Sequence, residues 1–263
     1  MTTSTYALAL PLLVAALVAT APIARAQGQE PSVTPYRPTV ANPAELPAPG
    51  WLELEAGWQR QQGGSDRRRD SLPVTAKLAF SEHWGVLLGT ELGLRSTDLD
   101  NNRYSGTGDT TLIVKHLIGG DPGQNGAWGV EAGAKSPTAS ENLGSGRTDY
   151  LLTLIYSLDA LGNRLDVNAG ATRLGAVDPG QERMQYGWAT SLSRPLNDSW
   201  GVFGELSGTR NTGGDTTRQY MLGGTYNMSK RVVLDFGMAR GLTAATPDWS
   251  AFFGVSLLSA RLW

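Results

Sequence analysis

The sequence lacks cysteine altogether and contains only two histidines, His83 and His116. Without cysteine the chain can form no disulfide framework, and it has no thiol for catalysis. Two histidines and scattered acidic residues do not make the ligand set of a metal site. We therefore expect neither a metal nor another cofactor.

A strong charge of one sign is also missing. The chain has 22 Lys and Arg against 24 Asp and Glu, and charged residues make up 17% of it, below the usual share of about a quarter. Glycine, in contrast, is abundant, with 33 residues among 263. No basic patch accompanies this balance, so we expect no nucleic-acid partner.

Long apolar runs are absent after residue 26. Before it, residues 7–22 form an apolar run that is short for a membrane-spanning helix of about 20 residues. Ala24-Arg25-Ala26 has the small-x-small pattern of a cleavage site, although residues 1–6 carry no Lys or Arg. We predict that residues 1–26 are a signal peptide cleaved after Ala26 and that the protein is exported.

Residues 27–50 contain a cluster of prolines, which precludes a central strand or a helix. We interpret this segment as an extended periplasmic N-terminal extension or linker. The alternative is a segment that folds back into the mouth of the domain that follows. We prefer the extension or linker.

Apolar residues alternate with small, polar or acidic residues through the rest of the chain. Leu234 and Phe236, for example, alternate with Asp235 and Gly237. This period of two is typical of a strand with two unlike faces. The large apolar face and the small polar face together predict an all-β fold: a closed antiparallel transmembrane β-barrel of about twelve strands in the bacterial outer membrane, residues 51–263. The predicted strands cover residues 51–61, 74–80, 85–96, 110–118, 127–135, 150–158, 165–174, 184–194, 200–210, 217–227, 232–239 and 249–257, with the end of the last strand open up to residue 263.

The lengths of the connections support this barrel. If the first loop is extracellular, external loops of about six to fourteen residues alternate with periplasmic turns of about two to five, except for residues 119–126. Tryptophans begin four of the upward strands, and Trp263 ends the chain, all at the predicted periplasmic rim, where indole rings favour the lipid interface. A secreted β-sandwich would also alternate, but it would explain neither feature. The four tryptophans are Trp51, Trp84, Trp128 and Trp200.

Charged residues on the small, polar face are the candidate functional residues, because they would line the lumen. Two interpretations remain open: a polar path for a small solute, or a salt-bridged filling that keeps a structural or surface-binding barrel closed. A twelve-stranded barrel lies between filled eight-stranded barrels and open porins. The candidates are Glu53, Glu55, Lys77, Glu91, Arg95, Lys115, Glu131, Lys135, Asp166, Glu205 and Asp235.

Catalysis by such a barrel is disfavoured. An outer-leaflet phospholipase needs a serine oriented by a histidine that a third polar side chain holds. His83 falls in a predicted periplasmic turn and His116 on the lipid side near the periplasmic end of its strand. Neither reaches the outer leaflet, so we predict that the protein is not an enzyme.

Several segments, in this order along the chain, resemble one known family. They include residues 106–109 (GTGD), 144–150 (GSGRTDY), 166–168 (DVN), 235–237 (DFG) and 240–249 (RGLTAATPDW). Together they resemble the outer-membrane barrels named for the meta-pathway of phenol degradation, over roughly residues 51–257. The resemblance implies a passive channel or transporter for small, aromatic or hydrophobic solutes.

The expected partners follow from this class: outer-membrane lipid and lipopolysaccharide, a small-molecule solute, and the barrel-assembly machinery through the C-terminal strand ending at Trp263. For a solute with an aromatic body and one acidic group, we predict that the inward cations hold its carboxylate or phenolate. These cations are Lys77, Arg95, Lys115 and Lys135.

Overall fold

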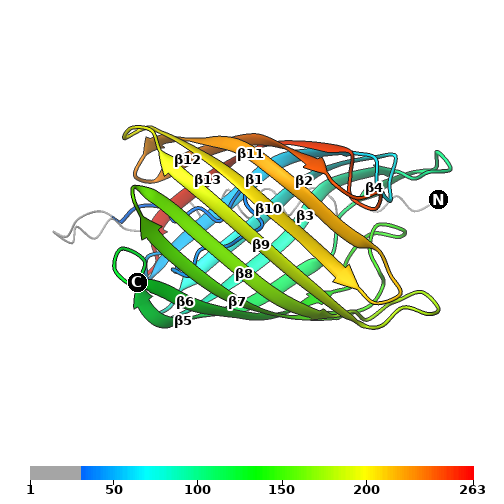
Figure 1. The fold of residues 1–263 in the computed structure, drawn as a ribbon, viewed down its shortest axis with the longest axis horizontal. Coiled ribbons are helices and arrows are strands. Elements are labelled where there is room, and N and C mark those ends of the chain that lie inside the picture. The colour runs from blue at the N-terminus through cyan, green and yellow to red at the C-terminus, as the bar shows by residue number, and fades with distance from the viewer. Residues whose placement is uncertain (1–30) are drawn as a thin grey trace, which may run out of the picture.

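The computed structural model describes residues 31–263 as a single closed barrel (Figure 1). The predicted signal peptide, residues 1–26, lies outside the described residues. No helix in residues 31–263 is both long and apolar enough to span a membrane. The strands are β1 (Trp51–Gln62), β2 (Arg68–Ala79), β3 (Trp84–Thr97), β4 (Arg103–Gly106), β5 (Thr110–Asp121), β6 (Gly126–Ser136), β7 (Asp149–Ala160), β8 (Asn163–Arg173), β9 (Met184–Pro195), β10 (Trp200–Asn211), β11 (Thr216–Ser229), β12 (Val232–Gly241) and β13 (Trp249–Arg261).

Every strand pairs antiparallel with its neighbours, and the sheet closes because β1 pairs with both β2 and β13. The short β4 pairs only with β3, beyond the stretch where β3 pairs with β5. The wall therefore has twelve strands plus one short addition, which confirms the predicted closed antiparallel barrel. Closure leaves no edge strand in the wall.

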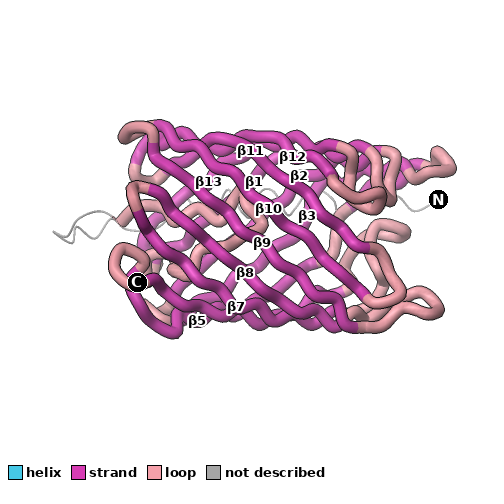
Figure 2. The backbone as a smooth tube through the Cα atoms, viewed as in Figure 1, coloured by secondary structure: helices cyan, strands magenta, loops and turns pink. Residues whose placement is uncertain are grey.

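The two ends of the barrel differ in their connections (Figure 2). We call the end with residues 98–102, 137–148 and 174–183 the loop end, and the end with residues 80–83 and 161–162 the turn end. The connection expected over residues 119–126 is shorter than predicted, because β5 continues to Asp121 and β6 begins at Gly126. In the turn between β3 and β4, hydrogen bonds from Asn102 hold the pKa of Asp98 below its ordinary value.

Aromatic rings surround the outside of the turn end, as the tryptophan spacing predicts. Trp84 stacks on His116 with ring centroids 4.0 Å apart. Trp128 and Tyr156 approach to 4.7 Å, as do Trp200 and Tyr226. These pairs sit where a membrane interface would meet the wall.

A β-bulge in β3 overturns one prediction. The pairing of β2 with β3 shifts between Asp70 and Leu72, and Gly93 beside the shift has a positive φ of 54°. One extra residue in a strand moves all later side chains to the opposite face. Leu94 is consequently buried inside, and Arg95, predicted to face the lumen, is exposed on the outer face.

Candidate functional site

Residues 31–50 run through the inside of the barrel, and we call them the plug. In Figure 1 the dark blue segment lies within the barrel, toward the turn end, before it joins β1. Tyr36, Ala41 and Ala44 are buried there. We expected a linker outside the barrel, and the structure instead shows the folded-back alternative. The reason is that the segment forms no strand, so its backbone groups find their partners in polar side chains of the inner wall.

Two glutamates of β1 and a lysine of β2 hold the first part of the plug. Lys77 Nζ lies 2.9 Å from Glu53 Oε2 and 2.7 Å from Glu55 Oε1. Glu53 accepts a hydrogen bond from the Thr34 N–H at 2.9 Å, and Glu55 accepts one from the Tyr36 N–H at 2.7 Å. Lys77 also donates to the Thr34 carbonyl. Each buried charge is therefore paired, as a low-dielectric interior requires.

The Tyr36 ring lies between two buried lysines. Lys77 Nζ is 3.8 Å and Lys115 Nζ 4.1 Å from the ring centroid, and the Tyr36 hydroxyl donates to the Glu45 carbonyl at 2.6 Å. Lys115 Nζ in turn lies 3.0 Å from Glu131 Oε1. Cation–π contacts of this kind are stronger when water is excluded, so Tyr36 is a central anchor of the plug.

The middle of the plug is held by single acceptors on the wall. Glu205 Oε2 accepts hydrogen bonds from the N–H groups of Val40 and Ala41 at 2.8 and 2.9 Å. One carboxylate thus satisfies two consecutive backbone donors, which fixes the chain direction at this point. Two other wall side chains also accept hydrogen bonds from the plug backbone. Asn168 Oδ1 accepts one from the Asn42 N–H, and Ser157 Oγ accepts one from the Ala44 N–H, each at 2.8 Å.

Arg164 of β8 fastens the later part of the plug. Its guanidinium lies 2.7 Å from Glu45 Oε1 and 2.9 Å from Asp166 Oδ1. Asp166 also accepts a hydrogen bond from Ser157. Asp166, predicted to line the lumen, therefore positions Arg164 for its ion pair with Glu45 of the plug.

Arg37 reaches across β1 and β13 to β12, where it pairs with Asp235 at 3.3 Å. The guanidinium lies against two glycines of the wall. A Cβ at Gly254 would come within 2.5 Å of Arg37 Nε, and one at Gly57 within 2.3 Å of an Arg37 terminal nitrogen. The absence of side chains at these positions is what lets Arg37 lie flat against β1 and β13.

We expect Gly254→Ala to displace Arg37 and to loosen the plug, measured as faster hydrogen exchange of the backbone amides of residues 37–41. Gly187→Ala is the matched control, because its new Cβ would meet no atom closer than 3.8 Å. Equal exchange rates in the two variants would show that the Arg37 contact does not hold the plug.

A vestibule lies on the loop side of the plug. Its larger part has a volume of about 570 Å³, a floor formed by plug residues 36–39 and 42, and walls from β2, β3, β5 and β6. A second part of about 480 Å³ follows β7 to β11. Its floor is formed by Val40 and Asn42, and Asn42 is shared with the larger part. The vestibule has the size of a small-molecule site.

Charged pairs face the larger part of the vestibule. Arg69 pairs with Glu91, and Lys135 lies 3.1 Å from Asp109 and 2.8 Å from Asp149. The side chains of Arg69, Glu91 and Lys135 each keep about a quarter to a third of their surface accessible, at 26%, 30% and 27%. These groups remain within reach of a solute, unlike the lysines beneath the plug.

The predicted lumen residues therefore divide into three groups. Glu91 and Lys135 face the vestibule, and Arg95 lies outside the barrel. The remaining eight hold the plug directly or through one neighbour: Glu53, Glu55, Lys77, Lys115, Glu131, Asp166, Glu205 and Asp235.

Sequence reasoning missed the plug's own residues and several of their partners. Arg69 was expected in a loop but lies in β2, which begins at Arg68. A tyrosine followed by an arginine within a proline-rich stretch was the available signal for Tyr36 and Arg37. The part of the chain described by the structure contains no group of three His, Asp or Glu able to hold a metal.

Solved structures show where else this fold occurs. An outer membrane channel from Pseudomonas putida F1 superposes with a TM-score of 0.63 at 14% identity, over 82% of this chain and 97% of that one. The KdgM porin superposes with a TM-score of 0.54 at 10% identity, over 78% of this chain and 98% of the porin. The NanC porin superposes with a TM-score of 0.53 at 11% identity, over the same shares of the two chains. The fold is thus that of outer-membrane barrels.

Sequence comparison identifies the family. No curated protein sequence matches the chain. The family model described as "Putative MetA-pathway of phenol degradation" matches residues 50–258, nearly the whole barrel. The chain belongs to this family.

Proposed function

We propose that the protein is a passive channel of the bacterial outer membrane for small solutes. The loop end faces outside, so a solute enters the vestibule from there, and the plug closes the path toward the periplasm. The shared fold with outer membrane channels and porins supports this class, and we assign no enzymatic activity. Export through cleavage after Ala26 and recognition of β13 by the barrel-assembly machinery complete the proposal.

One observation carries the proposal: a vestibule of about 570 Å³ ends on a plug that polar contacts fasten. Apolar contact between plug and wall comes from small clusters: one joins Val33 to Val233 and Leu258, and another joins Ala44 to Ala127 and Ile155. Hydrogen bonds and ion pairs of the plug can be exchanged for water when it shifts, so displacement costs less than unpacking an apolar core would. These contacts are compatible with a plug that closes the lumen and can be displaced to open it.

The vestibule wall indicates the class of solute. Leu87, Ile113 and Leu143 contribute apolar surface beside Arg69 and Lys135. This combination fits a small molecule with an aromatic or aliphatic body and one carboxylate or phenolate. Lys77 and Lys115 are fully buried beneath Tyr36, so we now assign the solute's anionic group to Lys135 and Arg69.

The test is solute entry into liposomes that contain the purified full-length protein. We expect benzoate and small sugars to enter faster than into protein-free liposomes, without an energy source. If neither the intact protein nor a form without the plug admits any solute, the channel proposal is wrong and a structural barrel replaces it.

Replacement of Lys135 tests the assigned charge. We expect Lys135→Gln to reduce benzoate flux several-fold, on the order of the factor of ten that one charge-assisted hydrogen bond supplies, while sugar flux changes little. Lys230→Gln is the control, because Lys230 is exposed in the turn between β11 and β12. An equal fall in both fluxes would mean that Lys135 serves packing through Asp109 and Asp149.

A further inference from the structure

Arginines gather on the outer face of the barrel at the loop end. Side chains on either side of them in the strands point inward: Gln59 and Gln61 flank Arg60, and buried Leu94 and Ser96 flank Arg95. Asp70 is the only acidic residue that the described strands place among them. We call this set the arginine belt; it consists of Arg60, Arg68, Arg95, Arg103, Arg173, Arg210, Arg218 and Arg240.

The belt is densest on β1 to β4. Asp70 stands opposite both Arg60 and Arg95 in the strand registers. Its two oxygens are already taken, because Arg60 Nε and Arg68 Nε each lie 2.6 Å from one of them. Within residues 31–263, Arg95 and Arg103 have no acidic partner. Four arginines thus surround the single carboxylate of Asp70. The arginines outnumber the carboxylate, which leaves a strong positive charge on the outer face.

A hollow of about 420 Å³ opens between these arginines. Its walls include Arg68, Arg95 and Arg103, with the hydroxyl-bearing Thr97 and Ser105 beside them. Guanidinium groups and hydroxyls around one hollow are the donors that phosphate oxygens accept from. The hollow therefore fits a phosphate group and not a cation.

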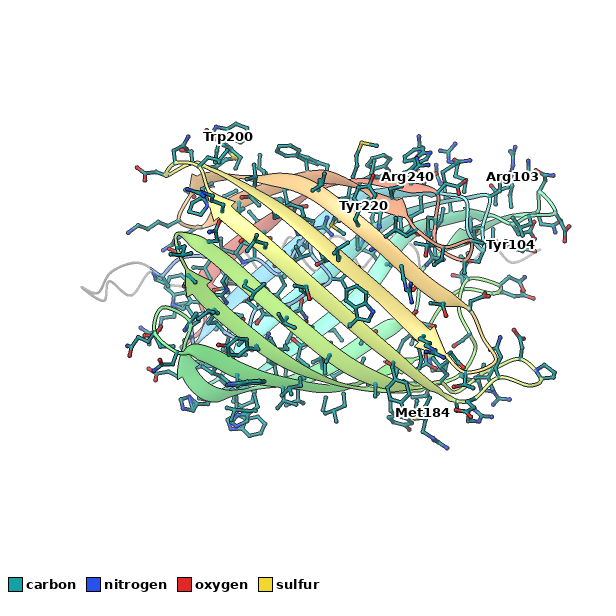
Figure 3. The ribbon with its side chains drawn as sticks, viewed as in Figure 1. Arg103, Tyr104, Met184, Trp200, Tyr220 and Arg240 are labelled. Atoms are coloured by element: carbon teal, nitrogen blue, oxygen red, sulfur yellow. The ribbon has the colours of Figure 1, made fainter. Side chains whose placement is uncertain are left out.

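The belt also has a fixed place relative to the membrane. In Figure 3, Arg103 and Arg240 lie toward the end of the barrel opposite Trp200. The outer face between the belt and the tryptophan rim is apolar, with Leu72 45% and Leu88 50% exposed. A ligand that covers both regions must carry phosphate at the outer headgroup level and acyl chains below it.

We propose that the β1–β4 part of the arginine belt binds the phosphate groups of lipopolysaccharide in the outer leaflet. Arg95 and Arg103 supply unpaired guanidinium groups, and the Asp70 pairs hold Arg60 and Arg68 in place beside them. The bulge at Gly93 creates this site, because without it Arg95 would face the lumen. The inference rests on the outer-membrane orientation proposed above and is independent of transport.

The test measures binding of purified lipopolysaccharide to the full-length protein in detergent. We expect Arg95→Gln/Arg103→Gln to weaken binding at least about tenfold, because charge-assisted hydrogen bonds are lost. Arg194→Gln is the matched control: Arg194 is also exposed, lies opposite Val202 on the outer face, and sits near the turn end. Arg103→Gln alone, in the short β4 outside the barrel wall, serves as a second variant that leaves wall pairing intact.

Two further probes separate the possible ligands. Dephosphorylated lipopolysaccharide should bind the unmodified protein as weakly as intact lipopolysaccharide binds the double variant. Equal binding with and without phosphate would overturn the proposal in favour of acyl-chain contact alone. Competition by inorganic phosphate at equal phosphate concentration would show a free-phosphate site instead of a lipid site. Unchanged solute entry in the double variant would confirm that loss of this site and loss of the channel are distinct.

Discussion

Deleting residues 31–49 should raise the single-channel conductance on the order of tenfold or more, because a twelve-stranded barrel without its plug is wider than the filled eight-stranded barrels. Gly50 is kept, since its N–H donates to the Ala79 carbonyl at 2.8 Å and fixes the start of β1. The measurement is conductance in planar bilayers. The charged wall residues beneath the plug then face water, where each is individually hydrated.

A reversible disulfide between plug and wall tests whether conduction requires the plug to move. The Ala44 N–H donates to Ser157 Oγ at 2.8 Å, so cysteines introduced at these two positions lie close enough for a disulfide. The chain has no other cysteine. We expect Ala44→Cys/Ser157→Cys to be silent when oxidised and conducting when reduced. Conduction that is the same in both forms would contradict a moving plug.

Replacement of Lys77 by methionine should produce the largest loss of stability. Lys77 is fully buried and pairs with Glu53 and Glu55, so its removal leaves two carboxylates beside each other without a counter-charge. Breaking a buried ion pair in this way costs about 3–5 kcal/mol of the free energy of unfolding. The measurement is urea unfolding in detergent, followed by the shift between folded and unfolded bands on unboiled gels.

Two variants test the cause of that loss. Lys230→Met removes an exposed lysine and should change the free energy of unfolding by less than about 0.5 kcal/mol. Glu53→Gln/Glu55→Gln/Lys77→Met removes the charges together and should recover much of the stability, because no buried charge is left unpaired. A triple variant as unstable as Lys77→Met would show that packing around Tyr36, and not charge, dominates.

The barrel itself follows from the sequence because its pattern is local. Alternation of Leu234 and Phe236 with Asp235 and Gly237 needs no knowledge of distant residues, and β12 has these faces as predicted. Trp84, Trp128 and Trp200 likewise lie at the rim that their positions at strand starts indicated. Strand ends were less predictable, since polar residues such as Arg68 extend β2 beyond its apolar part.

The site could not be predicted in the same way because its contacts are not local. Glu205 meets Val40 and Ala41 across more than half of the chain, and no periodicity connects them. Alternation assigned Arg95 to the lumen, and a single bulge at Gly93 reversed that assignment. Charged inward residues were recognised as a group, but whether they face a solute or a chain segment depends on the position of residues 31–50.

The position of the plug's root has a consequence for the order of assembly. The plug joins β1, the strand whose pairing with β13 closes the wall, and the Leu262 N–H donates to the Gly50 carbonyl at 2.7 Å. The seam and the base of the plug are therefore completed by neighbouring hydrogen bonds. The root of the plug is therefore fixed in the same step that closes the wall, and the segment stays tethered beside the lumen from the moment the barrel is complete.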